Sequence, residues 1–259
     1  MQNTHKHEPF YLWDLLVQMV GRDLKLRYRG SILGIAWSLL NPLAQLLVFS
    51  FVFRSILPLN IPNYTLFLFI GLLVWSWFHA SLMGAATVIV DSRMLIKQPT
   101  FPVAILPIVV VIANLLHFLL ALPVLFLFLS QAGIQLGVPT ILLPLIIILQ
   151  VLFTLGLAYF VSTFHVFFRD TQHLVGVFLF LFFYLTPIFY SADVIPAKYQ
   201  VFYRLNPVLQ LLEAYRAILL KDTWPAAGSL LLVGIVSVVW LILGYTVFKQ
   251  ASYRFVEEL

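Results

Sequence analysis

Long stretches without a charged residue constrain this chain more than any other feature. Residues 98–168 contain no Asp, Glu, Lys or Arg, and shorter charge-free stretches cover residues 30–53, 55–90, 171–192 and 223–248. A helix needs about 20 mostly apolar residues to cross the hydrocarbon core of a membrane. Only 10% of the residues are charged, whereas soluble domains have about a quarter. The sequence therefore predicts an all-α integral membrane protein and excludes a soluble enzyme.

We expect six membrane-spanning helices. The long charge-free stretch suffices for two crossings, divided by a polar break with Gly and Pro at residues 130–140. The expected spans are residues 31–53, 64–89, 103–129, 141–166, 174–190 and 228–248. An even number of crossings places both termini on the same side, with residues 249–259 as a tail.

Lys and Arg are unequally divided between the two sides of this arrangement. Ten of the 15 flank the termini or lie in the loops after the second and fourth spans: Lys6, Arg22, Lys25, Arg27, Arg29, Arg93, Lys97, Arg169, Lys249 and Arg254. The other five lie on the opposite side: Arg54, Lys198, Arg204, Arg216 and Lys221. Because basic residues concentrate in cytoplasmic segments, we expect both termini in the cytoplasm.

Residues 10–29 precede the first span and carry a polar stripe. Its members recur every three or four residues, the period of an α-helix: Asp14, Gln18, Arg22, Lys25 and Arg29. Asp23 and Arg27 can pair across one turn. We interpret this segment as an amphipathic helix in the cytoplasmic membrane interface, continuing into the first span through Gly30. A plain juxtamembrane helix without a special role remains the alternative.

Residues 191–227 are too apolar for a solvated loop, yet prolines interrupt them. They contain two short amphipathic pieces separated by Leu205, Asn206 and Pro207, and neither piece is long enough to cross a membrane. Irregular backbone at membrane depth requires cover by protein or water. We therefore expect a re-entrant helical pair from the outside; two helices lying flat on the outer leaflet are the alternative. Glu213 and Arg216 are three residues apart and can pair on one face.

Several motifs are missing from the sequence. It has no Cys, no GxxxxGK[ST] phosphate loop, no HExxH or GxSxG motif, and no Asp or Glu inside the expected spans. The histidines at positions 79, 117, 165 and 173 are scattered, and a lone membrane histidine is more often a helix–helix hydrogen-bond partner than a ligand. We therefore predict no catalytic residue, no metal, no cofactor in this chain and no nucleic-acid partner. Energy for transport, if used, must come from a partner.

Two short loops on the cytoplasmic side are compact and charged. They cover residues 92–102 and 167–173. A cytosolic ATPase that drives this protein would push on such surfaces. Ordinary anchored turns are the alternative.

Four blocks of sequence carry a resemblance. RDLKLRYRGSILGIAWSLLNP begins at Arg22, FFRDTQHLVG at Phe167, YLTPIFYSADVIP at Tyr184 and LNPVLQLLEAYRAILL at Leu205, and the chain ends in SYRFVEEL. In this order they resemble the permeases of type 2 ATP-binding-cassette exporters, most closely those that export O-antigen, capsule or teichoic acid polymers on lipid carriers.

The resemblance implies partners and roles. It implies a homodimer in the bacterial inner membrane, bound to two ATPase subunits that hold ATP and Mg, and a lipid-linked polysaccharide substrate, foremost O-antigen. Export of a drug, a lipid or another small amphiphile is the alternative, and a membrane enzyme or scaffold acting on lipid-linked sugars is a third. The resemblance also implies that residues 10–29 form the interface helix and residues 191–221 the gate helices. The coupling elements would be Leu95, Ile96, Lys97, Gln98, Arg169, Asp170 and Thr171.

A polysaccharide channel calls for aromatic side chains, because sugar rings pack on aromatic faces through weak, repeated contacts. The candidates within or beside the spans are Trp37, Trp75, Trp77, Tyr184, Phe189 and Tyr190. Membrane aromatics usually face lipid or form the interfacial belt, which is the alternative for each of them.

Basic residues are the candidates for contact with a lipid-linked pyrophosphate, because guanidinium groups suit phosphate. Arg22, Lys25 and Arg29 are placed at the inner leaflet, where attraction to anionic membrane lipids is the competing interpretation. Glu213 and Arg216 are placed in the second gate helix, where Arg216 would either contact the anion or orient the helix. A pair exposed at the outer surface is the alternative.

Overall fold

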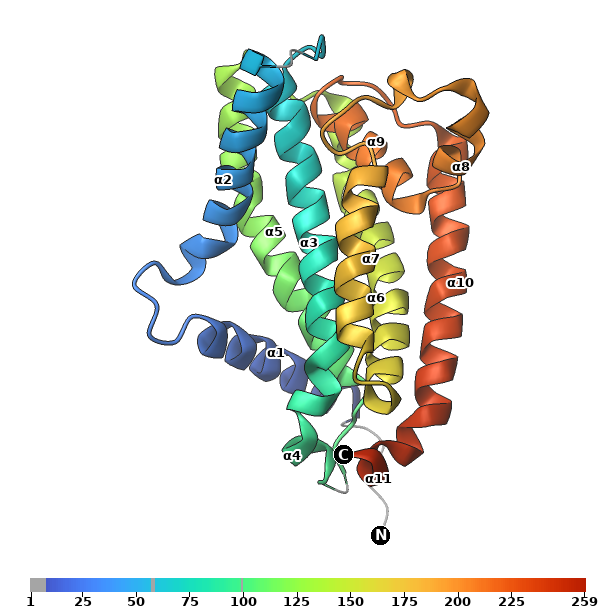
Figure 1. Cartoon of the computed structure of the whole chain (residues 1–259). Coiled ribbons are helices and arrows are strands. Elements are labelled where there is room, and N and C mark those ends of the chain that lie inside the picture. The colour runs from blue at the N-terminus through green and yellow to red at the C-terminus, as the bar shows by residue number, and fades with distance from the viewer. Residues whose placement is uncertain (1–7, 57–58, 99) are drawn as a thin grey trace.

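The computed structural model describes residues 8–56, 59–98 and 100–259, and the regular elements within these ranges are all helices. The predicted all-α class is therefore confirmed for this part of the chain. Most of the long helices run side by side along one axis (Figure 1). Lys6, used above to assign the cytoplasmic side, lies outside the described residues.

Four helices within the described residues are long and apolar enough to cross a membrane. They are α3 (Tyr64–Asp91), α5 (Ile105–Gln131), α6 (Leu143–Phe167, after the 3-10 turn Val138–Leu142) and α10 (Ala227–Ala251, continued by the turn Ser252–Arg254 and by α11, Phe255–Glu258). They coincide with the second, third, fourth and sixth expected spans. Their length and composition make this a multi-pass membrane protein.

The helices at the first and fifth expected spans are shorter than expected. α2 (Trp37–Phe51) and α7 (Thr171–Leu185) have 15 residues each, or about 22 Å of helix against about 30 Å of hydrocarbon. α7 ends early because Pro187 disfavours helical geometry at Thr186, where ψ is 132°. α2 begins late because the chain first turns through Gly34 at φ +52°. Beyond α2 the chain continues in a π-helical turn, Val52–Ile56.

α3 lies at the centre of the bundle. It packs against α2, α5, α6, α7 and α9, and residues 66–75 are all buried. A helix that is apolar on every face suits such a position. α10 differs, because it packs mainly on α6 and leaves Leu231, Ile235 and Ile242 60–66% exposed. This apolar outer face suits contact with lipid.

α6 and α10 approach each other closely at two glycines. A Cβ on Gly156 would stand 2.5 Å from the backbone nitrogen of Leu241, and one on Gly244 would collide with the carbonyl of Gly156. Ser237 also donates a hydrogen bond to the carbonyl of Leu149 at 3.2 Å. Small residues that permit close backbone approach are the usual means of packing membrane helices.

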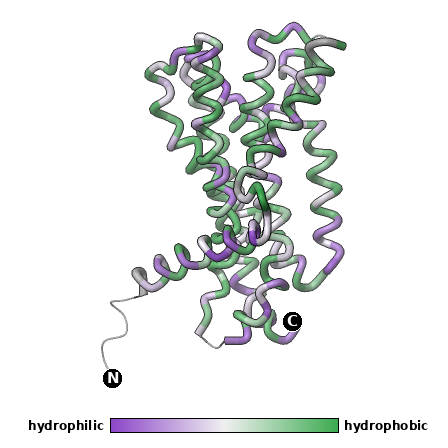
Figure 2. Tube along the Cα trace, turned by 90° about the vertical axis from the view of Figure 1, so that its left-hand side faces the viewer, coloured by the Kyte–Doolittle hydropathy of each residue, from purple (hydrophilic) through white to green (hydrophobic). Residues whose placement is uncertain are grey.

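The amphipathic N-terminal segment forms helix α1 (Glu8–Arg27). It lies across the other helices rather than along them in both views, and hydrophilic residues recur along it (Figures 1 and 2). It packs against α5. Gly30, expected to lead into the first span, has φ +77° and lies in the turn after α1.

The two short pieces expected between the fifth and sixth spans are helical. α8 (Gln200–Arg204) and α9 (Pro207–Leu219) are separated by Leu205 and Asn206. The Asn206 side chain accepts hydrogen bonds from the backbone N–H groups of Val208 and Leu209 at 3.0 and 3.3 Å. An N-cap asparagine followed by proline is a strong helix start, and it explains why α9 begins there.

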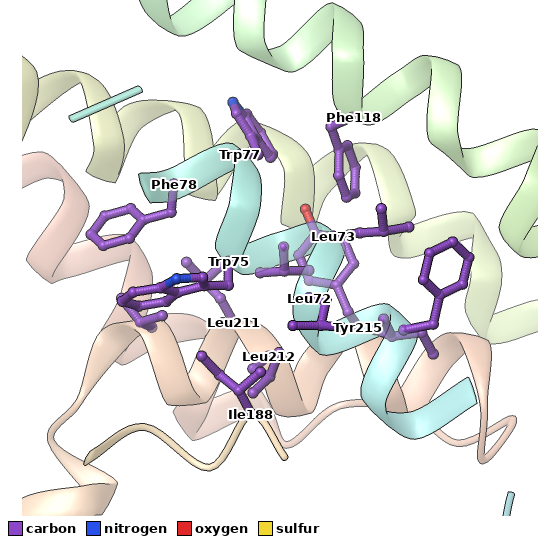
Figure 3. Close-up of a cluster of buried hydrophobic side chains, with 14 of the residues drawn as sticks. Leu72, Leu73, Trp75, Trp77, Phe78, Phe118, Ile188, Leu211, Leu212 and Tyr215 are labelled. Carbon is purple, nitrogen blue, oxygen red and sulfur yellow. The ribbon is translucent and has the colours of Figure 1, made fainter. Parts of the chain in front are cut away.

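Buried apolar side chains form two clusters. The larger surrounds α3 and α9 and includes Leu72, Trp75, Phe118 and Tyr215 (Figure 3). The smaller lies where α3, α5, α6 and α10 meet α4 (Arg93–Ile96) and α11, and Phe255 belongs to it. We call this second region the α4 end, and we call the opposite end of the bundle the α9 end (Figure 1).

Candidate functional site

A pocket of about 850 Å³ opens among α2, α3, α5 and α7, beside the C-terminal end of α1. Four of the six predicted channel aromatics line it: Trp37, Trp75, Trp77 and Tyr184. They come from α2, α3 and α7, which are brought together only by the fold. The pocket is therefore the feature around which a candidate site can be built.

The four lining aromatics differ in their exposure. Trp37 and Tyr184 are 47% and 48% exposed, so their rings are open to a molecule in the pocket. Trp75 and Trp77 are 6% and 2% exposed, and both belong to the packed core (Figure 3). Trp77 stacks on Phe118 with ring centroids 5.0 Å apart, and its Nε1 donates to the carbonyl of Val111 at 3.4 Å.

Phe189 and Tyr190 do not line the pocket; they follow α7 at the α9 end. The ring of Phe189 stacks on Phe49 and Phe53 of the α2 region at 5.6 and 5.5 Å. The hydroxyl of Tyr190 lies 3.2 Å from the carbonyls of both Tyr184 and Leu185. These two side chains join the end of α7 to its surroundings.

One wall of the pocket is polar. The guanidinium of Arg27 donates to the side-chain carbonyl of Asn114 at 2.9 Å, and the hydroxyl of Tyr28 lies 3.3 Å from Nε2 of His117. All four residues line the pocket. The partner of His117 lies in the turn after α1 and not in a helix, so the helix–helix role expected for the histidines stays a prediction. Polar groups at membrane depth are costly unless partnered and commonly mark a substrate path.

Asn114, Arg27 and Tyr28 were not among the residues expected at a site. Arg27 was expected only to pair with Asp23, and that pair is present at 3.2 Å. The signal for a further role was the pair of polar residues Asn114 and His117 in the middle of a mostly apolar helix, and Asn114 is 2% exposed in the structure. A buried amide three residues before a histidine indicates a polar face on α5.

The basic residues proposed for phosphate binding lie on α1 and in the turn that follows it. Arg22, Lys25 and Arg29 are exposed and line a separate groove of about 640 Å³ with neighbouring residues of the same segment. Arg22 and Lys25 keep the helical spacing that placed them on one face, whereas Arg29 lies in the turn beyond the end of α1. None of the three lines the aromatic pocket, whose only cation among the described residues is Arg27.

The two expected coupling elements lie at the α4 end. Lys97 and Gln98 are exposed, whereas Ile96 is 4% exposed and packs in the smaller apolar cluster, with Leu95 half-buried. The turn between α6 and α7 exposes Arg169 and Asp170. Thr171 begins α7, and its hydroxyl donates to the carbonyl of Phe168 at 2.6 Å.

Arg216 of α9 is fully buried, at 0% exposure. Its Nη1 donates to the carbonyl of Pro187 at 2.8 Å and to Glu213 at 3.0 Å. Its Nη2 donates to the carbonyl of Ile188 at 2.7 Å and to that of Phe67 at 3.4 Å. The predicted pair with Glu213 is confirmed.

The surroundings of Arg216 fix its position. Its guanidinium carbon lies 3.4 Å from the ring centroid of Phe67, and a Cβ on Gly71 would stand 3.1 Å from Nη2. Gly71 therefore leaves room for the guanidinium beside α3. In this arrangement both terminal nitrogens are occupied by protein oxygens. Glu213 is partly exposed and also lies 3.6 Å from the ammonium of Lys221.

Among the described residues no cluster of three or more His, Asp or Glu could hold a metal ion. The pocket wall offers donors, acceptors and ring faces instead. Such a lining suits reversible binding of an amphiphile with hydroxyl groups or an anionic group.

Comparison of the sequence with known protein families identifies the family of this chain. Residues 14–220 match the ABC-2 type transporter family, and the chain belongs to that family. It is thus a permease component and not a catalytic enzyme.

Curated relatives extend over nearly the whole chain. It is 37% identical to the O-antigen export system permease protein RfbA of Myxococcus xanthus, over 95% of each chain. It is 36% identical to the O-antigen export system permease protein RfbA of Klebsiella pneumoniae, over 98% of each chain.

Proposed function

We propose that this protein is the membrane-spanning subunit of an exporter that moves lipid-linked O-antigen polysaccharide out of the cytoplasm. The observation that carries the proposal is identity of 35–37% over 95–98% of the chain to three permease proteins named for O-antigen export. A separate ATPase subunit binds ATP and Mg and supplies the energy, and the permease itself forms a homodimer with two such subunits.

The topology that we propose has six crossings in the bacterial inner membrane, with both termini in the cytoplasm. Four long helices and the two short helices α2 and α7 support it. The short pair can span if the turns that extend them also lie at membrane depth, which is permitted where protein covers the backbone. The α4 end faces the cytoplasm, because Arg93, Lys97, Arg169, Lys249 and Arg254 belong to it and, with the four basic residues at positions 22–29, outnumber the five on the other side.

In this proposal the aromatic pocket is part of the export path. Trp37 and Tyr184 offer exposed ring faces to sugar, and the polar wall on α5 offers hydrogen bonds to hydroxyl groups. A second copy would complete the path, because α2 and α7 both flank the pocket and expose apolar side chains. Leu47, Val48 and Phe51 of α2 are 63–72% exposed, and Phe178, Leu181 and Leu185 of α7 are 54–59% exposed.

The aromatic residues can be ranked by experiment. Trp37→Ala and Tyr184→Ala should slow export while leaving the amount of protein in the membrane unchanged, because both side chains are half exposed at the pocket. Trp240→Ala is a comparison outside the pocket, on α10. Normal surface polymer in both variants would remove Trp37 and Tyr184 from the path.

The remaining expected roles follow the same plan. α8 and α9 form the re-entrant gate at the outer side, and Arg216 orients α9 because protein oxygens occupy its terminal nitrogens. α1 is the interface helix, and Arg22, Lys25 and Arg29 attract either the substrate pyrophosphate or anionic lipid. The seven coupling residues, Leu95, Ile96, Lys97, Gln98, Arg169, Asp170 and Thr171, receive the movement of the ATPase.

Export of a small amphiphile is the second candidate function. The pocket of about 850 Å³ favours it, because sites for drug-sized ligands fall in this range of volume. The two functions differ in what stimulates the complex. If the permease is purified with its ATPase, lipid-linked glycan should raise ATP hydrolysis; a response to a small amphiphile alone would favour the second function, and no associated ATPase would contradict both.

A further inference from the structure

The C-terminal segment packs back into the bundle instead of extending as a tail. Phe255 of α11 is 0% exposed. Its ring lies 5.3 Å from Phe248 of α10 and 6.3 Å from Phe167 at the end of α6. It shares the smaller apolar cluster with Ile96 of α4, and α11 contacts both α4 and α6. One buried ring thus packs beside the first expected coupling element, at Ile96, and against Phe167, just before the second.

Three separate segments consequently form one surface at the α4 end. They are α4, the turn of residues 168–170 and residues 252–258 (Figure 1). Each contributes an exposed large apolar side chain: Met94 at 74%, Phe168 at 64%, and Tyr253 at 78% with Val256 at 52%. Each also contributes exposed charged residues: Arg93 and Lys97, Arg169 and Asp170, and Arg254, Glu257 and Glu258.

Lipid is a poor cover for this surface. The surface carries seven exposed charged side chains of both signs, and charged side chains are costly near hydrocarbon. Its four cations would be attracted to the anionic headgroups of the cytoplasmic leaflet, but Glu257 and Glu258 would be repelled by them. The surface therefore faces water, where apolar side chains with a charged rim are typical of a protein interface. The partner that fits is one that binds α4 and the 168–170 turn at the same time.

We infer that residues 252–258 are a third docking element for the ATPase subunit, with Tyr253 and Val256 as contact side chains and Phe255 as the anchor that positions them. The inference rests on the proposed function. It gives a role to residues 252–258, to which none had been assigned. It also explains why α11 packs against α4, since a tail that only faced solvent would not need this contact. The movement of an ATPase would reach α4, α6 and α10 together.

Labelling of single cysteines tests this directly, since the chain has no Cys of its own. Tyr253→Cys, Met94→Cys and Val138→Cys are purified in detergent, with and without the co-expressed ATPase, and treated with a fluorescent maleimide. Val138 is the control, because it is 74% exposed and begins the 3-10 turn Val138–Leu142, which contacts α9. Residues excluded from water at the centre of an interface should react roughly ten-fold more slowly in the complex. We expect this for Tyr253→Cys and Met94→Cys, and no change for Val138→Cys.

The three variants separate the possible failures. Protection of Met94→Cys without protection of Tyr253→Cys overturns the inference and leaves the proposed function intact. Absence of protection at both positions contradicts the proposed coupling role of α4 itself. Slow labelling of Tyr253→Cys that does not depend on the ATPase would mean that this side chain is covered by something else, and it also overturns the inference.

A charge substitution provides a second readout. Val256→Glu places a carboxylate at the centre of the proposed contact, whereas Val138→Glu makes the same change at the other end. We expect Val256→Glu to reduce the ATPase retained on the permease by roughly ten-fold, with Val138→Glu at the level of the unaltered protein. Equal retention in both variants contradicts the inference.

Discussion

The two ends of the bundle are held together by different chemistry. At the α9 end a single buried guanidinium binds three carbonyls on two segments, that of Phe67 in α3 and those of Pro187 and Ile188 in the loop after α7, besides Glu213 of its own helix. At the α4 end the segments meet through aromatic rings packed around Phe255. The first arrangement is directional and the second is not.

This difference has consequences for movement. Hydrogen bonds to a charged group fix distance and angle, so α9 and the loop after α7 should move as one body with α3. Apolar packing tolerates small sliding as long as the rings stay in contact, so α4 and α11 can transmit displacement without losing cohesion. The α9 end, proposed to hold the gate helices, needs fixed geometry. The α4 end, proposed to receive the movement of the ATPase, needs tolerance of small displacements.

The largest effect should come from Arg216→Ala. The change leaves the buried carbonyls of Pro187 and Ile188 without their donor, and each unsatisfied buried acceptor costs about 1–3 kcal/mol. Thermal unfolding in detergent should show a strongly lowered midpoint, and export should be lost. Arg216→Lys should restore little, because an ammonium cannot reproduce the planar fork.

Lys221→Ala is the matched control on the same carboxylate. Lys221 is 56% exposed on its side chain and lies 3.6 Å from Glu213, and such exposed pairs contribute about 0–1 kcal/mol. A loss for Lys221→Ala as large as that for Arg216→Ala would show that the α9 end does not depend on the buried guanidinium.

A smaller loss is expected for Phe255→Leu at the α4 end. The side chain stays apolar and loses only part of its volume, so the cost should lie between that of Ile→Val, about 0.5–1.5 kcal/mol, and that of Phe→Ala, about 3–5 kcal/mol. Because packing is non-directional, export should persist at a reduced rate. Val256→Leu, on the exposed neighbour, should leave the unfolding midpoint unchanged. Complete loss of export in folded Phe255→Leu would contradict the tolerance assigned to this end.

Between the two ends, Arg27 and Asn114 attach α1 to α5. A double-mutant cycle with Arg27→Met and Asn114→Ala should yield a coupling of about 0.5–1.5 kcal/mol, since their hydrogen bond is 2.9 Å long and partly buried. The same cycle with Arg22→Met should give no coupling, because Arg22 lines the other groove of α1. An equal coupling energy to Asn114 for Arg27 and Arg22 would contradict the orientation of α1 on α5 described above.

The smallest effect on stability is expected for Lys25→Glu combined with Arg29→Glu. Both side chains are exposed, and surface substitutions usually change the free energy of unfolding by less than about 0.5 kcal/mol. Export should nevertheless fall if these residues guide the substrate pyrophosphate. Unchanged export with weaker binding to anionic vesicles would assign them to membrane lipid instead.

Gaps between charges were sufficient to locate the long helices. The early end of α7 was also encoded locally, at Thr186 and Pro187, although charge spacing alone extended the expected span to residue 190. The LNP sequence correctly separated α8 from α9, because an asparagine cap and a proline at the first helical position are local signals.

The pocket and the Arg216 contacts could not be predicted, because they depend on segments far apart in the chain. Arg27 and Asn114 are 87 positions apart, and Arg216 and Phe67 are 149 apart. The sequence indicated that Arg216 could pair with Glu213, three residues away. It could not indicate that Arg216 also binds backbone carbonyls, because every residue has one and the pattern of side chains does not single any of them out. Likewise, Phe255 was indistinguishable from other aromatic residues until α11 was found against α4.

Transport by purified components in lipid vesicles tests the central claim most directly. The permease is reconstituted alone or with its ATPase, and the movement of lipid-linked glycan across the vesicle membrane is followed with and without ATP. We predict movement only when both the ATPase and ATP are present. Sustained accumulation of glycan on one side by the permease alone would contradict the conclusion that this chain is a gated path driven by its partner.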